Sequence, residues 1–502
     1  MSAFVRRSKF MLAPLALLLV AGCTLREQPE IGLAPVPHAW TYGPTARPGT
    51  VNLSLVDWWK QYRDPQVSLL VNQALAGNPS VAEALYRVQA ARALARADNA
   101  LRFPQGTPRA GIEITSRLAG PAAGLNEAGE AAGQGERRTV GVGQAGVDAS
   151  WEIDLFGRLG AQAGASERNA EARVEDLEAA RTTLAADVVR TYIELRGAQR
   201  RRAVVVNEIE ARRQLAQLVR SQQAAGLAGE FDVQRAAATF EAARARLPLV
   251  EAEVALATQR LATLTGQPAA TAALRRSMGG IPMTATPGPT LPADLLRMRP
   301  DIRRSELTVL QRAALAEVAY AELFPRLTLG GSIEVRANVL ATPIAGTPVT
   351  VAGGPGISIP LFDWGQRRAL LNAREAELKE GIASYRRVVL EAVGEVEIAL
   401  SQVRQQALRV DRLRTAVDAA RRAFVTAQRL YQAGEINLTE RLQAEADLRQ
   451  AELDFAAASE TRAVALVTLY RALGAGPGRL PALPAPTAAP PPLISILARE
   501  SQ

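Results

Sequence analysis

Residues 291–325, LPADLLRMRPDIRRSELTVLQRAALAEVAYAELFP, decide the fold, because residues 78–104, NPSVAEALYRVQAARALARADNALRFP, are a weaker copy of them. In both copies a proline opens a helical run, and a Phe-Pro pair closes it after the same number of residues. Self-similarity at a fixed spacing indicates an internal duplication. The function must therefore explain why one chain needs two similar halves.

The match between the halves continues downstream. Residues 150–158, SWEIDLFGR, correspond to residues 357–366, ISIPLFDWGQ. Further on, two pairs of glycines are equally spaced: Gly226 with Gly266, and Gly434 with Gly474. The repeat therefore extends over most of the chain.

The composition favours long helices and disfavours an enzyme. The chain has 502 residues, of which only 5% are aromatic, and its alanine-rich runs suit close-packed helices. A single cysteine excludes a disulfide framework, and a single histidine, His38, leaves little for metal or acid-base chemistry. We expect no catalytic residues, no metal site and no cofactor apart from covalently attached lipid.

The charge pattern argues against a nucleic-acid partner. The formal net charge is +9, but basic residues are interleaved with acidic ones along the helical runs. Interleaved charges are typical of solvated helix faces, whereas nucleic-acid binding needs basic clusters.

The first 22 residues predict a lipoprotein signal peptide. They have a basic start and a short apolar run, and LVAGC at residues 19–23 resembles a bacterial lipobox. In such signals the cysteine, here Cys23, becomes the first mature residue and carries a diacylglycerol and an N-acyl chain such as palmitate. Thr24, rather than Asp, implies sorting to the outer membrane. The alternative is an ordinary secretory signal with an incidental buried cysteine.

Two regions have the period-two pattern of strands. One hairpin is expected at about 108–151 and its repeat at about 326–361, which gives four strands of membrane-spanning length per chain. Four strands cannot close a barrel, and an open edge in lipid leaves backbone groups unpaired. The chain must therefore oligomerise, and three copies would supply about twelve strands.

Long helices are expected in both halves: 158–225, 230–264, 364–432 and 437–473, and Pro248 should bend or locally loosen the second of them. At 1.5 Å per residue the longest would reach about 100 Å, which suits a cylinder of paired helices. The domain prediction divides the chain as follows: a leader at 1–22, an extended arm at 23–56, a first repeat at 57–266, a linker at 267–291, a second repeat at 292–474 and a Pro/Ala-rich tail at 475–502.

These features together resemble the TolC-like outer membrane efflux proteins, in particular the NodT/OprM lipoprotein branch. The resemblance covers residues 57–474 and rests on the lipobox and four ordered motifs: WW at 58–59 with DP at 64–65, SWEIDLFGR at 150–158, YIELRG at 192–197, and LLRMRPDIR at 295–303. Each motif alone is weak, but their order is specific.

The resemblance implies a mainly α protein with a membrane β-barrel. Three chains would form a 12-stranded barrel in the outer membrane and a long α-helical barrel in the periplasm. Such a homotrimer docks onto a periplasmic adaptor protein and an inner-membrane pump, here expected to be of the RND type. It is a passive exit duct for small molecules such as drugs, and each chain supplies two sectors of one tube.

The resemblance also implies where the duct closes. The family keeps its periplasmic tip shut with the helix pairs that meet at two tight turns. Asp232 and Tyr431 match a pair that links neighbouring coiled coils, so they are the expected latch. An arginine of that family's latch is replaced by Ile436, so that part is absent.

The resemblance implies a constriction of the tip by acidic residues at two positions near the start of the last helix. Glu440 occupies one of them, and the other is Gln443 here, so the ring would carry fewer charges. A three-fold ring of Glu440 would favour cations. The alternative for Glu440 is an ordinary first-turn acid stabilised by the helix dipole. For the tip glycines, Gly226, Gly229 and Gly434, adaptor docking and simple helix capping are compatible.

Two other classes of protein remain as alternatives. A structural lipoprotein that spans the periplasm without a pore would not need the strand pattern at 108–151 and 326–361. An adaptor would be expected to have compact β-rich domains flanking a single hairpin rather than this duplication. The cargo and the pump are not encoded in any motif that we identify.

Overall fold

The computed structural model describes residues 37–42, 55–118, 137–271, 274, 280–283, 298–338 and 349–479. The predicted leader, Cys23 and much of the predicted arm, linker and tail lie outside these residues. The elements follow in this order: η1 (Trp58–Tyr62), α2 (Pro65–Gly77), α3 (Pro79–Ala100), β1 (Gln105–Leu118), β2 (Arg137–Ile153), α4 (Arg158–Ala224), α5 (Glu230–Leu264), α8 (Pro300–Ala321), β3 (Arg326–Asn338), β4 (Val349–Ser358), α9 (Gln366–Gln432) and α10 (Leu438–Ala472). None of these described helices is long and apolar enough to cross a membrane.

The duplication appears as pairs of helices of equal length. α3 and α8 have 22 residues each, α4 and α9 have 67, and α5 and α10 have 35. Gly157 and Gly365, directly before α4 and α9, have positive φ angles of 74° and 84°. α9 begins two residues later than the sequence predicted, because Trp364 has a left-handed φ of 53° and Asp363 accepts a hydrogen bond from the N–H of Arg367.

The chain divides into two compact units, and neither is one of the sequence repeats. The first unit includes residues 85–174 and 302–388, and the second includes residues 35–84, 175–301 and 389–502. Each unit therefore combines segments of both repeats. In the first unit the reason is plain, because the two hairpins share one sheet.

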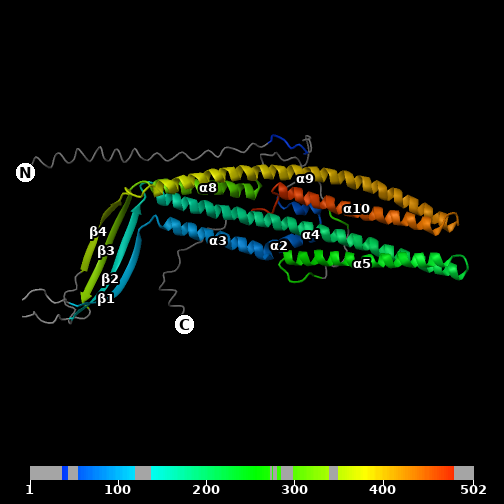
Figure 1. Cartoon of the computed structure of the whole chain (residues 1–502), viewed down its shortest axis with the longest axis horizontal. Coiled ribbons are helices and arrows are strands. Elements are labelled where there is room, and N and C mark those ends of the chain that lie inside the picture. Colours follow the sequence, from blue (N-terminus) through cyan, green and yellow to red (C-terminus); the bar gives the residue numbers. More distant parts are fainter. Residues whose placement is uncertain are drawn as a thin grey trace, which may run out of the picture. The chain divides into compact units, whose positions relative to one another are not determined.

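That sheet is antiparallel, with the strand order β1-β2-β3-β4 (Figure 1). Gln105 lies opposite Ser150 in the first hairpin and Arg326 lies opposite Ser358 in the second. Ser358, rather than Ile357, is therefore the counterpart of Ser150. The hairpins are joined by the β2–β3 pair, so β1 and β4 form the two outer edges.

The strands differ from the expected ranges at their ends. β1 begins at Gln105 and β2 ends at Ile153, beyond the expected 108–151, because residues 105–107 pair with β2 through their backbones without an alternating apolar pattern. β4 ends at Ser358 instead of near residue 361. Pro360 has no N–H to donate, and this explains why the ladder stops there.

The two faces of the sheet differ in chemistry. Side chains of paired residues point to the same face, and one such row contains Pro108, Val147, Ile333 and Val351. Val147, Ile333 and Val351 are all exposed. The other face carries polar residues, including the ion pairs of Arg109 with Asp148 and Glu334. The sheet thus has an exposed apolar face and a polar face.

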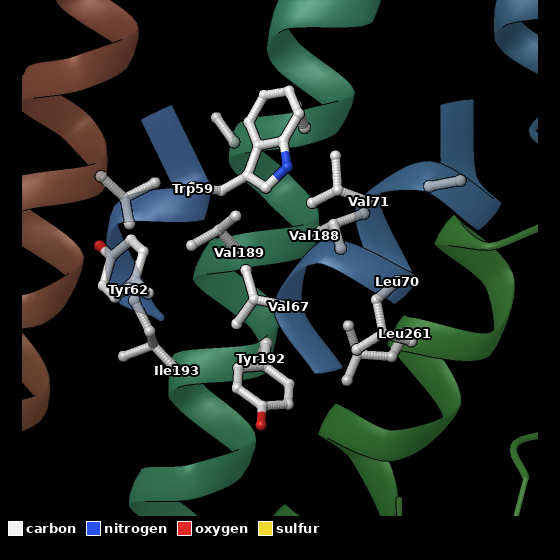
Figure 2. Close-up of a cluster of buried hydrophobic side chains, with 14 of the residues drawn as sticks. Trp59, Tyr62, Val67, Leu70, Val71, Val188, Val189, Tyr192, Ile193 and Leu261 are labelled. Atoms are coloured by element: carbon white, nitrogen blue, oxygen red, sulfur yellow. The ribbon is translucent and has the colours of Figure 1, made fainter. Parts of the chain in front are cut away.

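In the second unit, α5 returns along α4 and α10 returns along α9 (Figure 1). A hydrophobic core joins α4, α5 and α10 to η1 and α2, with Val67, Leu70 and Tyr192 among its members (Figure 2). Trp58 and Trp59 are buried, and Trp58 stacks on Tyr470 with ring centroids 4.6 Å apart. The double tryptophan therefore packs in a core.

A hydrogen-bond chain stabilises the same core. Asp64 caps α2 by accepting from the N–H of Gln66 at 2.9 Å, and it also accepts from the Tyr192 hydroxyl at 2.7 Å. Arg196 donates to that hydroxyl at 2.7 Å. Burial, with the bond to Asp64, raises the pKa of Tyr192 to about 12. Residues from two of the motifs that carry the resemblance are thus parts of one folded core.

Candidate functional site at the helical turns

The two turns that connect the long helices are built alike. α4 ends before Gly226, whose φ of 74° lets Leu227 donate back to the carbonyl of Gln222 at 2.8 Å. α9 ends before Gly434, whose φ is 77°, and Glu435 donates back to the carbonyl of Leu430. This arrangement satisfies carbonyls at the end of each helix and needs glycine at the left-handed position.

Gly229 differs from the other two glycines. Its φ is −87° and its ψ is 162°, an extended conformation that other residues adopt, and it precedes the first residue of α5. A Cβ atom at Gly226, Gly229 or Gly434 would meet nothing within 4 Å. These three positions are therefore exposed at the turns, and backbone conformation explains the glycine only at Gly226 and Gly434.

Glu230 stabilises the turn between α4 and α5. Its carboxylate accepts hydrogen bonds from Gln223 before the turn and Gln234 after it, both at 2.6 Å. These bonds hold the pKa of Glu230 below its ordinary value. The side chain therefore joins the end of α4 to the start of α5.

Tyr431 is bonded within the chain, but not to Asp232. The Tyr431 hydroxyl donates to Oε1 of Gln222 at 3.2 Å, which connects α9 to α4. Asp232 lies in the first turn of α5, and its carboxylate has no partner among the residues that the structure describes. The structure therefore does not bring the two predicted latch residues together within one chain, and sequence reasoning missed Gln222.

Two further contacts join the first helical hairpin to the second. Leu215, Val219 and Ala236 pack with Leu438 and Leu442 in a small apolar cluster. Arg235 donates to the hydroxyl of Thr439 at 2.8 Å. Ile436 stands where the family's latch has an arginine. A different arginine, Arg235, joins the two hairpins here.

A buried charged pair lies on α10 beyond the turn. Arg441 contacts Glu445 at 3.4 Å, and the Arg441 guanidinium lies 5.9 Å from the centres of the Phe424 and Tyr431 rings. Glu445 is 0% exposed, and its Oε1 has no hydrogen-bond partner in the described part of the chain. The charge pattern of the sequence did not distinguish this pair from the many exposed ones on the helices.

The predicted constriction residues lie on an exposed face of α10. Glu440 is exposed, and its N–H is capped by the Asn437 side chain at 3.0 Å. Gln443 is exposed and donates to Asp447 at 2.8 Å. Asp447 lies one turn beyond Gln443, so this face carries a second carboxylate that the sequence prediction did not include.

The chain is similar to known proteins over most of its length. A family model described as outer membrane efflux protein matches residues 70–267 and 291–475. Nodulation protein T of Rhizobium leguminosarum bv. trifolii is 26% identical over 465 residues, 92% of this chain and 96% of that protein. Outer membrane protein OprJ of Pseudomonas aeruginosa is 29% identical over 484 residues, 94% and 97% of the two chains.

The fold is similar to that of solved channels. The structure of the outer-membrane channel OprN matches with a TM-score of 0.78 at 32% sequence identity. The match covers 90% of this chain and 99% of that one. The similarity therefore extends over most of this chain and nearly all of that one.

Proposed function

Since the chain belongs to the outer membrane efflux protein family and is an outer membrane channel for efflux, we propose that it works as a homotrimeric exit duct. A periplasmic adaptor and an inner-membrane pump of the RND type would deliver cargo to it. Small molecules such as drugs would then pass through it passively. The fold, long paired helices with a β-sheet, is that of the family's channels.

The observation that carries the proposal is the sheet of the first unit. It has an exposed apolar face, a polar face and two outer strands, β1 and β4. In a membrane barrel the apolar face meets lipid and the polar face lines the lumen, and no edge is left open. Three copies would supply about twelve strands, enough for a lumen, whereas two would leave almost none.

The lipid anchor is the second part of the proposal. The lipobox-like sequence ending at Cys23 supports a diacylglycerol and an N-acyl chain on that residue. Each buried methylene contributes about 0.8 kcal/mol, so several acyl chains hold a protein stably in a membrane. The anchor would keep the N-terminus at the outer membrane.

The helical turns are the proposed gate. The bond of Tyr431 to Gln222 supports a latch between coiled coils, and the unpartnered carboxylate of Asp232 is available to a neighbouring copy. Exposed Glu440 and Gln443 on α10 support a constriction of moderate negative charge. The exposed glycines Gly226, Gly229 and Gly434 would receive the adaptor.

The test is single-channel conductance of the detergent-extracted protein in a planar bilayer. We expect small openings that favour cations, with a cation preference that falls in the Glu440→Gln variant because the three-fold ring loses its charge. Glu241→Gln, which removes an exposed carboxylate from α5, is the matched control and should leave selectivity unchanged. The absence of any channel from folded, lipidated protein would contradict the proposal.

A further inference from the structure

In the described sheet, the two repeats meet at one seam. There β2 pairs with β3, with Ile153 opposite Leu327 and Gly143 opposite Ala337. At the end of this seam, Phe156 stacks on Phe324, with ring centroids 4.7 Å apart and an interplanar angle of 16°. The seam thus consists of a strand pair and an aromatic stack beside it.

The two hairpins have matching registers, so each residue of this seam has a counterpart in the other repeat. Gln105 and Arg326 open the first strands, and Ser150 and Ser358 face them. β3 is therefore the counterpart of β1, and β4 is the counterpart of β2. A second seam would join β4 to β1, and these are the two outer strands of the sheet within the chain.

The aromatic stack also has counterparts. Trp364 directly precedes Gly365, as Phe156 directly precedes Gly157, and both glycines have a positive φ. Phe103 stands before the proline that leads into β1, as Phe324 does for β3. Trp364 is fully exposed and Phe103 is 61% exposed, whereas Phe156 and Phe324 are partly buried by each other.

The helices next to the sheet also differ in exposure between the two repeats. Ala165 of α4 is 2% exposed, but its counterpart on α9, Ala373, is exposed. Leu94 of α3 is 64% exposed, but its counterpart on α8, Leu315, is half-buried. The repeats therefore differ in exposure where the second seam would form, and a second copy of the chain is the occupant whose surface fits both sides.

We propose that, in the homotrimer proposed above, Trp364 of each copy stacks on Phe103 of the next copy, beside a β4–β1 strand pair in which Val351 lies opposite Ser116. This register follows from the seam inside the chain, where Gly143 of β2 lies opposite Ala337 of β3. Val351 of β4 is the counterpart of Gly143, and Ser116 of β1 is the counterpart of Ala337. The inference rests on the trimer of the proposed function and adds its register and contact.

The faces of the two strands agree with this register. Val351 shares a row with Ile333 and Val147 on the apolar face, and Ser116 lies on the same face of β1 as Ile112 and Ile114. A slip by one residue would turn the apolar side chains of one strand to the polar face of the other. The register derived from the internal seam avoids this mismatch.

Cysteine pairs test the register in the full-length, lipidated protein. Val351→Cys combined with Ser116→Cys should give covalent oligomers after mild oxidation, because directly opposite residues lie within disulfide reach. Two pairs that are out of register by two residues, Val351→Cys with Ile114→Cys and Ile357→Cys with Ile112→Cys, should cross-link at least tenfold less. Single-cysteine variants control for Cys23.

Alanine variants test the stack. Trp364→Ala and Phe103→Ala should each weaken the trimer, and the double variant should show a coupling of roughly two- to tenfold per interface in the dissociation equilibrium. Phe362→Ala is the matched control, because Phe362 is also exposed but has no stacking counterpart in the seam. Additive effects of Trp364→Ala and Phe103→Ala would overturn the stack and favour a role of Trp364 at the membrane surface.

The outcomes separate this inference from the proposed function. A trimer in which only the out-of-register pairs cross-link would overturn the inference and leave the exit duct intact. A protein of native mass that never forms a trimer would overturn the homotrimer on which both depend. Efficient cross-linking of Val351 to Ser116, with coupled aromatic variants, would support the inference.

Discussion

At the scale of single residues, the pair of Arg441 and Glu445 places two buried charges near the turn between α9 and α10. Removing one partner of a buried pair leaves an uncompensated charge, which costs about 3–5 kcal/mol. Arg441→Leu should therefore destabilise the helical hairpin by about that amount, measured as earlier thermal unfolding of the extracted protein. The double variant Arg441→Leu with Glu445→Leu should recover most of the loss, and equal losses in both would contradict a charge effect.

Tyr431 is the residue through which the gate can be tested. A hydrogen bond between neutral groups contributes about 0.5–1.5 kcal/mol, so Tyr431→Phe should raise the probability of the open state about fivefold. The change would be measured as single-channel open probability, and Tyr86→Phe, an exposed tyrosine away from the turns, is the control.

Variants of the two possible acceptors show where the latch bond goes. Gln222→Leu should match Tyr431→Phe if the bond inside the chain closes the gate, and Asp232→Ala should match it if a neighbouring copy supplies the acceptor. Unchanged open probability and antibiotic sensitivity in all three variants would contradict the latch hypothesis.

At the scale of elements, the α4–α5 turn should be sensitive to acid. The lowered pKa of Glu230 means that its contribution to stability is complete at pH 7. This contribution is lost as the pH falls below the ordinary glutamate value of about 4.3 and through the lowered value. The protection factors of the backbone amides in residues 222–236, which correct for the slower intrinsic exchange in acid, should therefore fall at low pH in the wild type, but show a smaller pH dependence in Glu230→Gln. The same pH dependence in both would exclude Glu230 as the cause.

The long helices could be predicted closely from the sequence. Helices were expected at 158–225 and 230–264, and α4 and α5 span Arg158–Ala224 and Glu230–Leu264. Uninterrupted helix formers and a terminal glycine are local signals, so they can be read without the fold. The motifs and the duplication likewise led to the family, which the comparisons confirm.

The contacts across the chain could not be predicted in the same way. The choice of Gln222 as the partner of Tyr431 depends on how two distant helices pack, and no local pattern encodes it. The burial of Glu445 also depends on tertiary packing, because neighbouring positions on α10 carry similar charges. The β2–β3 pair, which joins the halves into one sheet, has the same dependence on long-range contacts.

At the scale of the whole molecule, the duplication has a physical purpose. Each repeat contributes one strand hairpin and one pair of long helices, so the proposed homotrimer would have six similar sectors around a tube. A periplasmic spacer without a pore would have no use for a four-stranded sheet with an exposed apolar face. The sheet and the duplication thus favour the duct over that alternative.

The most direct test of the central claim is the native mass of the detergent-extracted, full-length protein. In the described part of the chain, β1 and β4 each pair along one edge only, which predicts an assembly of three copies, because three is the smallest number that closes the sheet around a lumen. A mass of three chains with bound lipid would agree with the exit duct. A stable, folded monomer or dimer would contradict it.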